Sequence, residues 1–255
     1  MMLKSIHSEW IKSRRTAIPW LLFLAPIAVT GIAALYVYPH HLEKDAWTRM
    51  LDLINQLWFA VWFPLAWGLL SGLSTHLESA SGGWRALRIR NVSPATLYGS
   101  KIAVLVIQTL LSTLWLAILT MIAGKMVAIP FEAPWLGFIA SFGTGWIASL
   151  PLLIVSLWLA EGLGWAIAVG FGTLGILIAS LIGATRLGVG IWQFIPWSWP
   201  IRLTYFVYAF ITKSIEMEMT PVVLVVFWSV FASSIGLSAI FAYFSIKWFH
   251  GREVK

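Results

Sequence analysis

Long apolar stretches with very few charged residues dominate the sequence and leave few folds open to it. A transmembrane helix needs ~20 consecutive apolar residues, and about six stretches of that kind are present. The chain is 60% hydrophobic and 11% charged, whereas a soluble domain carries ~25% charged residues. We therefore predict an all-α polytopic membrane protein with one transmembrane domain over residues 1–255. The expected spans are 17–39, 53–75, 97–123, 135–160, 163–183 and 222–248.

Residues 1–16 precede the first expected span and mix charged with apolar side chains. We expect them to form an amphipathic helix on the membrane surface, with Leu3, Ile6 and Trp10 facing lipid. The apolar run that follows is too long for a cleaved signal peptide.

The polar interval at residues 75–101 separates the second and third expected spans and concentrates positive charge. Within it, residues 78–93 fit a short amphipathic helix in which Trp84 and Leu87 share the apolar side. The arginines of this helix then face water or lipid phosphates: Arg85, Arg88 and Arg90. We interpret this interval as a loop on the membrane surface that receives a partner protein.

Residues 184–221 are rich in aromatic side chains but contain Pro196 and Pro200, which interrupt any full span. We expect two short re-entrant or interfacial helices that meet near Pro196, ahead of the last span.

Basic residues divide unevenly between the two sides of this topology. An even number of spans places both termini on one side, and that side carries 11 of the 17 Lys and Arg residues. Because cytoplasmic loops hold the excess of Lys and Arg, we predict cytoplasmic termini, a cytoplasmic helix at 78–93 and an external segment at 184–221. This distribution accounts for the net charge of +7 through membrane topology, and we expect no nucleic-acid partner.

The sequence contains no HExxH, GxSxG or GxxxxGK motif, and it has no cysteine. The expected spans hold few ionisable groups, so we predict neither an intramembrane enzyme nor a relay for an ion gradient. We interpret His40, His41 and Glu43 as polar residues at a span end. We thus expect no catalytic, cofactor or metal site in this chain, and energy supplied by a partner ATPase.

Seventeen tryptophans are present, and most suit anchoring at the membrane surface. Trp58, Trp62 and Trp67 share one face of the second expected span. They either pack or face lipid, or they line a lateral surface for an amphipathic substrate. Glu78, at the end of that span, has two compatible interpretations. It forms a helix-end hydrogen bond or salt bridge, and it anchors the loop so that a partner's motion reaches the span.

A family resemblance joins these features. The amphipathic start SEWIKSRRT precedes the first span, and an E-x-x-x-G-x-W-basic pattern follows the second, at Glu78, Gly82, Trp84 and Arg85, with TLYGSK after it. The chain resembles the permease subunit of type-2 ABC exporters. More narrowly, it is similar to the lantibiotic self-protection permeases of the epidermin and mutacin type from Gram-positive producers.

The resemblance implies a protein of the bacterial cell membrane that works with two copies of an ABC ATPase. It also implies a second related permease or a second copy of this chain, with ATP and Mg²⁺ bound by the ATPase. The substrate would be a cationic lantibiotic expelled from the membrane to the medium. Residues 78–92 would be the coupling helix that docks into the ATPase, and six contacts are expected: Glu78, Trp84, Arg85, Leu87, Arg88 and Arg90.

In this interpretation the external segment forms a gate or a cap that faces the substrate. The expected substrate-facing residues are Trp58, Trp62, Trp67, Trp192, Trp197 and Trp199. Other functions stay open at this point. They are a permease for bacitracin-type peptides, for several drugs or for lipids, and a membrane scaffold that transports nothing.

Overall fold

The computed structural model describes residues 2–80, 93–213 and 220–251. All regular structure in these residues is helical, which confirms an all-α polytopic protein. Six helical stretches of the described chain are long and apolar enough to cross a membrane. They are Ile18–His40, Ala46–His76, Pro94–Met126, Trp135–Leu163, Trp165–Gly183 and Pro221–Gly251.

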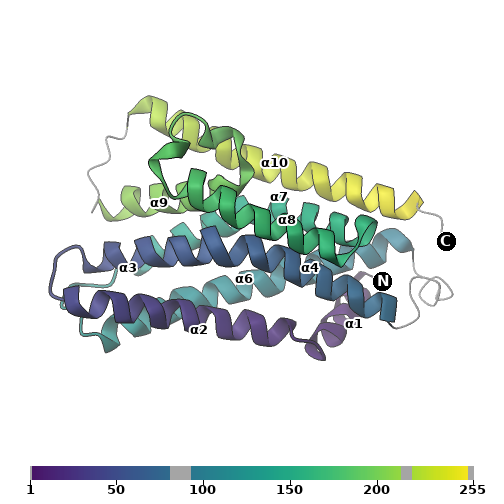
Figure 1. Ribbon diagram of the computed structural model, residues 1–255, viewed down its shortest axis with the longest axis horizontal. Helices are drawn as coiled ribbons and strands as arrows, with labels where there is room; N and C mark the ends of the chain where they lie inside the picture. The colour runs from purple at the N-terminus through teal and green to yellow at the C-terminus, as the bar shows by residue number, and fades with distance from the viewer. Residues whose placement is uncertain (1, 81–92, 214–219, 252–255) are drawn as a thin grey trace.

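The long helices lie side by side along the longest axis of the molecule (Figure 1). The described chain begins and ends at one end of this bundle, where α4 also ends and α6 begins. This arrangement agrees with an even number of spans. The long helices are α2 (Ile18–Val37), α4 (Phe63–Ala80), α6 (Pro94–Met126), α7 (Trp135–Leu163), α8 (Trp165–Ile178) and α10 (Pro221–Gly251).

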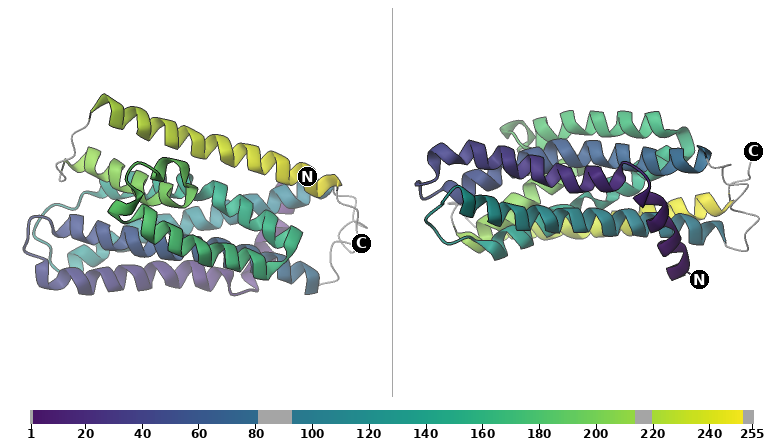
Figure 2. Two further views of the ribbon diagram at one scale, coloured as in Figure 1. Left: turned by 45° about the horizontal axis from the view of Figure 1, so that its top comes forward. Right: turned by 90° about the horizontal axis from the view of Figure 1, so that it is seen from below.

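Helix α1 (Met2–Arg14) leaves the bundle at an angle, as the right-hand view of Figure 2 shows. Its buried residues are polar and recur every four positions: Ser5, Glu9 and Ser13. This stripe faces α6, since Gln108 Nε2 donates to Ser13 Oγ at 2.6 Å. Leu3, on the other side, is 82% exposed. The helix is therefore amphipathic, but its buried side is polar and faces the protein, while apolar side chains point outward.

The second span begins earlier than the sequence analysis predicted. Helix α3 (Ala46–Asn55) continues through the π-helical segment η2 (Gln56–Trp62) into α4, so residue 53 is not its start. The polar residues of α3 conceal a helical pattern of buried apolar positions at Trp47, Met50, Leu51 and Ile54. As a consequence Asp52, expected in a loop, lies inside the helix.

The interval expected between the spans 135–160 and 163–183 is also misplaced. Helix α7 continues to Leu163, and the chain reverses at Gly164, whose φ of +103° suits glycine. Glu161 is therefore a buried helical residue.

Close approach of backbones holds α4 against α8. A Cβ added at Gly172 would stand 2.4 Å from the carbonyl oxygen of Pro64, and one at Gly68 would stand 2.5 Å from that of Ala168. Small residues permit this packing between membrane helices, where water supplies no force to bring apolar surfaces together.

Between α8 and α10 the chain is broken, as expected, but its described residues form one α-helix and several short turns where two short helices were predicted. The π-helical segment η3 (Ala179–Gly183) leads into three short 3₁₀ turns: η4 (Arg186–Gly188), η5 (Trp192–Phe194) and η6 (Pro196–Ser198). Helix α9 (Trp199–Thr212) then runs to the end of the bundle opposite the termini (Figure 1). Pro200 is tolerated because it lies in the first turn of α9, where its missing N–H has no helical acceptor.

Candidate functional site

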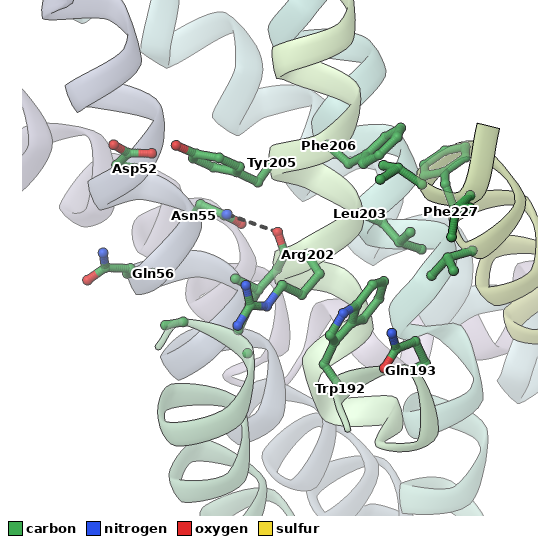
Figure 3. A pocket seen from close by; sticks show the side chains of 16 residues that line it. Asp52, Asn55, Gln56, Trp192, Gln193, Arg202, Leu203, Tyr205, Phe206 and Phe227 are labelled. Carbon is green, nitrogen blue, oxygen red and sulfur yellow. Dashed lines mark hydrogen bonds between the residues drawn. The ribbon is translucent and has the colours of Figure 1, made fainter. Parts of the chain in front are cut away.

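A pocket of about 550 Å³ lies between α3, α9 and α10 (Figure 3). Helices α3 and α9 lie in the half of the bundle farther from the termini (Figure 1). This volume lies within the range of ~300–1,000 Å³ that accommodates small ligands. It would hold a side chain or terminal group of a peptide, not a whole folded peptide. Its polar and aromatic lining includes Asp52, Asn55, Gln56, Trp192, Gln193, Arg202, Tyr205, Phe206 and Phe227.

The acidic side of the pocket belongs to α3. The carboxylate of Asp52 points toward the ring of Tyr205 on α9 (Figure 3). Among the described residues, no Lys or Arg side chain forms an ion pair with Asp52, because Arg49 pairs instead with Glu43 and Asp45. The negative charge of Asp52 is therefore available to a ligand.

Asn55 lies one turn further along the same side and is 3% exposed. Its Nδ2 donates to the carbonyl oxygen of Ile201 at 3.1 Å, which joins α3 to α9. Its Oδ1 has no hydrogen-bond partner within the described chain. A buried acceptor without a partner carries a desolvation cost of ~1–3 kcal/mol.

Arg202 supplies positive charge to the same pocket, but much of it is already engaged. Its Nη2 donates to the carbonyl oxygens of Ile182 at 3.2 Å and Thr185 at 2.5 Å. The carbonyl of Ile182 belongs to the last turn of the α8–η3 helix and that of Thr185 follows it, and the C-terminal end of a helix favours a cation. Arg202 thus fixes the end of that helix against α9.

Two π-helical segments border the pocket. Segment η2 begins at Gln56, and η3 ends at Gly183, both of which line the pocket. Pro64 follows η2 closely and cannot donate to a preceding carbonyl. Such segments are rare and recur at functional sites, which supports this pocket as the site of the molecule.

The structure separates the predicted tryptophans. Trp58 and Trp67 are 0% and 1% exposed and pack in the aromatic core around Phe63, at ring distances of 5.1 and 4.6 Å. They therefore present no lateral surface to a substrate, and the packing interpretation describes them. Trp62 is half-buried next to Trp58.

Of the three tryptophans in the segment predicted to be external, only Trp192 lines the pocket. Trp199 is buried, and its Nε1 donates to the carbonyl oxygen of Gln193 at 2.9 Å. Trp197 packs against Phe171 of α8, with ring centroids 4.9 Å apart. The last two stabilise the turns that place Trp192.

The predicted docking residues largely fall outside the described chain. This applies to Trp84, Arg85, Leu87, Arg88 and Arg90. Glu78 lies on the last turns of α4, and its side chain is likewise outside the description. The docking prediction therefore stays a prediction. Helix α4 ends and helix α6 begins at the end of the bundle where the termini lie (Figure 1).

A buried ion pair near that end escaped the sequence analysis. Lys101 Nζ lies 2.5 Å from Glu161 Oε1, and each side chain is 1% exposed. Thr75 Oγ1 of α4 also donates to Glu161 at 3.2 Å. The pair joins α6 to α7 and α4, so the spans, which were expected to hold few ionisable groups, contain a buried ion pair. Each residue sits near a helix end, where sequence alone suggests a surface position.

The sequence was compared with known families, curated proteins and solved structures. The model of a family described as ABC-2 family transporter protein matches residues 5–172, well over half of the 255 residues. The chain belongs to the ABC-2 transporter family. No curated protein and no solved structure matches it.

Membership in the ABC-2 transporter family makes this chain a membrane permease of an ABC exporter, and it confirms that part of the resemblance. Such a permease is the transmembrane component and is not itself catalytic. The family implies an ABC ATPase partner and a multi-pass location in a membrane.

Proposed function

We propose that this permease expels a lantibiotic, a cationic antimicrobial peptide, from the membrane to the medium. The producing cell would thereby be protected from its own product. Two copies of an ABC ATPase would drive the export, with ATP and Mg²⁺ bound there. A second related permease or a second copy of this chain would complete the transporter.

The pocket between α3, α9 and α10 is the observation that carries this proposal. Asp52 provides a negative charge without an ion-pair partner in the described chain. Trp192, Tyr205 and Phe206 add aromatic surface. An ammonium group at the end of an apolar side chain satisfies both features, and cationic amphipathic peptides carry such groups.

The charge distribution supports the direction of transport. With cytoplasmic termini, the end of the bundle reached by α9 faces the outside (Figure 1). The pocket then opens in the outer half of the membrane, where a peptide that attacks the cell from outside first inserts.

Substrate-stimulated ATP hydrolysis by the permease purified with its ATPase tests the proposal. We expect a cationic lantibiotic to stimulate hydrolysis, and Asp52→Asn to raise the half-maximal peptide concentration about tenfold or more. This magnitude corresponds to the ~1.5–3 kcal/mol of a hydrogen bond to a charged group. Asp45→Asn is the matched control, because Asp45 precedes α3 outside the pocket and pairs with Arg49.

The comparison of ligands distinguishes the proposed substrate from other exporter substrates. Stimulation by bacitracin-type peptides, neutral drugs or lipids, with none by lantibiotics, would contradict the peptide assignment. Equal responses of the two Asp variants would contradict the assignment of the pocket.

A further inference from the structure

A second, smaller recess lies at the terminal end of the bundle, where α1 meets α2 and α6. It encloses about 230 Å³ and is lined largely by apolar side chains. Phe23 of α2 and Leu111 of α6 are 49% and 50% exposed there, so the recess opens outward between the helices. We call it the α1 groove and define it by Trp10, Arg14, Phe23, Gln108, Leu111 and Trp115.

The walls of the α1 groove are fixed by interhelical bonds. Gln108 Nε2 of α6 donates to Ser13 Oγ of α1, and Ser112 Oγ of α6 donates to the carbonyl oxygen of Leu22, both at 2.6 Å. The rings of Phe23 and Trp115 stack with centroids 5.7 Å apart and an interplanar angle of 10°. The groove is therefore a built feature of three packed helices.

Polar groups without partners lie along this apolar groove. Gln108 is 6% exposed, yet its Oε1 has no hydrogen-bond partner within the described chain. Trp115 Nε1 is a buried donor in the same situation. Both atoms are buried behind the wall of the recess, whose open lining is largely apolar.

The mouth of the groove is basic. Arg14 lines it and is exposed, and none of the ion pairs in the described chain includes it. The nearby carboxylate of Glu9 faces α6 and pairs with Lys12. The charge of Arg14 is therefore left for a group outside the protein. Trp20, 66% exposed on the next helix, is typical of a residue at the membrane surface.

We propose that the α1 groove binds one anionic phospholipid, of the phosphatidylglycerol type. An acyl chain fills the space between Phe23 and Leu111, and the phosphate meets Arg14. Basic recesses between spans on the cytoplasmic side bind anionic headgroups in this manner. The lipid would fasten α1 to the membrane independently of the transported substrate.

The test is lipid binding to the full-length chain in mild detergent, measured by native mass spectrometry during titration with phosphatidylglycerol. We expect Arg14→Gln to raise the dissociation constant about fivefold, from ~1 kcal/mol per basic residue near a membrane surface. Arg15→Gln is the matched control. This substitution removes the same charge at the next position, and Arg15 does not line the groove. We expect phosphatidylcholine to bind more weakly and to be insensitive to Arg14→Gln.

Leu111→Trp supplies a second, independent variant. The larger side chain would fill the apolar part of the α1 groove, and the position is already exposed, so the fold can accommodate it. It should weaken the binding of phosphatidylglycerol while α1 keeps its charge. Equal effects of Arg14→Gln and Arg15→Gln would overturn the proposal, because they would indicate general attraction to the helix. Displacement of the lipid by inorganic phosphate would also overturn it, since the acyl chain would then contribute nothing.

Discussion

The buried pair of Lys101 and Glu161 offers a sharp test of the packing of α6 against α7. Glu161→Gln leaves the ammonium group of Lys101 in an environment where each side chain is 1% exposed. Removal of one partner from a buried ion pair costs about 3–5 kcal/mol. For a chain of this size, each kcal/mol lowers the unfolding midpoint by ~2–4 °C, so we expect a loss on the order of 10 °C.

The assay is thermal unfolding of the purified protein in detergent, followed by tryptophan fluorescence. The double variant Lys101→Met with Glu161→Leu is the informative control. Apolar side chains of similar volume in place of a buried pair are often neutral or stabilising. Thr75 keeps an acceptor in that variant, because its Oγ1 also donates to the carbonyl oxygen of Ser71 at 3.0 Å. We expect the double variant to recover most of the lost stability.

Two results would refute this reasoning. An unchanged midpoint in Glu161→Gln would mean that the charge of Lys101 does not depend on Glu161 for its stabilisation. A double variant as unstable as the sum of the two single variants would mean that the residues act independently and do not form a pair.

Two further predictions concern helix packing and partner docking. Gly172→Ala should destabilise the protein by about 1–3 kcal/mol in the same unfolding assay, because its Cβ would meet the carbonyl oxygen of Pro64 at 2.4 Å. Gly170→Ala on the same helix should be neutral or stabilising, since open space surrounds it. Reversal of Arg85 and Arg88 to Glu should abolish co-purification of the ATPase while the unfolding midpoint is retained. Retained co-purification would remove these arginines from the docking surface.

The number of spans could be predicted from the sequence because hydrophobic length alone determines which helices can cross a membrane. The start of the second span could not. The polar residues around Asp52 gave α3 the composition of a loop, and only the spacing of Trp47, Met50, Leu51 and Ile54 indicated a helix. In this segment the spacing of apolar residues indicates the helix, whereas the composition suggests a loop.

The tryptophans of the second span show a different limit. Their spacing correctly places Trp58, Trp62 and Trp67 near one face, but it does not tell whether that face points inward. Lipid and the interior of a membrane protein are both apolar, so hydrophobicity does not distinguish them. Contacts with Phe63 show that this face packs inside the bundle.

The candidate site depends on contacts between distant segments. Asn55 and Ile201 are 146 residues apart, and Lys101 and Glu161 are 60 apart. In each pair, the sequence around one residue does not indicate which residue it contacts. The family could be inferred from the sequence, because topology and the interval after the second span are local features. The pocket required the fold.

The release of a fluorescently labelled lantibiotic from the membranes of living cells tests the central claim most directly. Cells that produce this permease with its ATPase should transfer the peptide to the medium while ATP is available. They should fail to do so when the permease carries Asp52→Asn. If the labelled peptide leaves the membrane at the same rate with and without the permease, the result would contradict lantibiotic export by this chain.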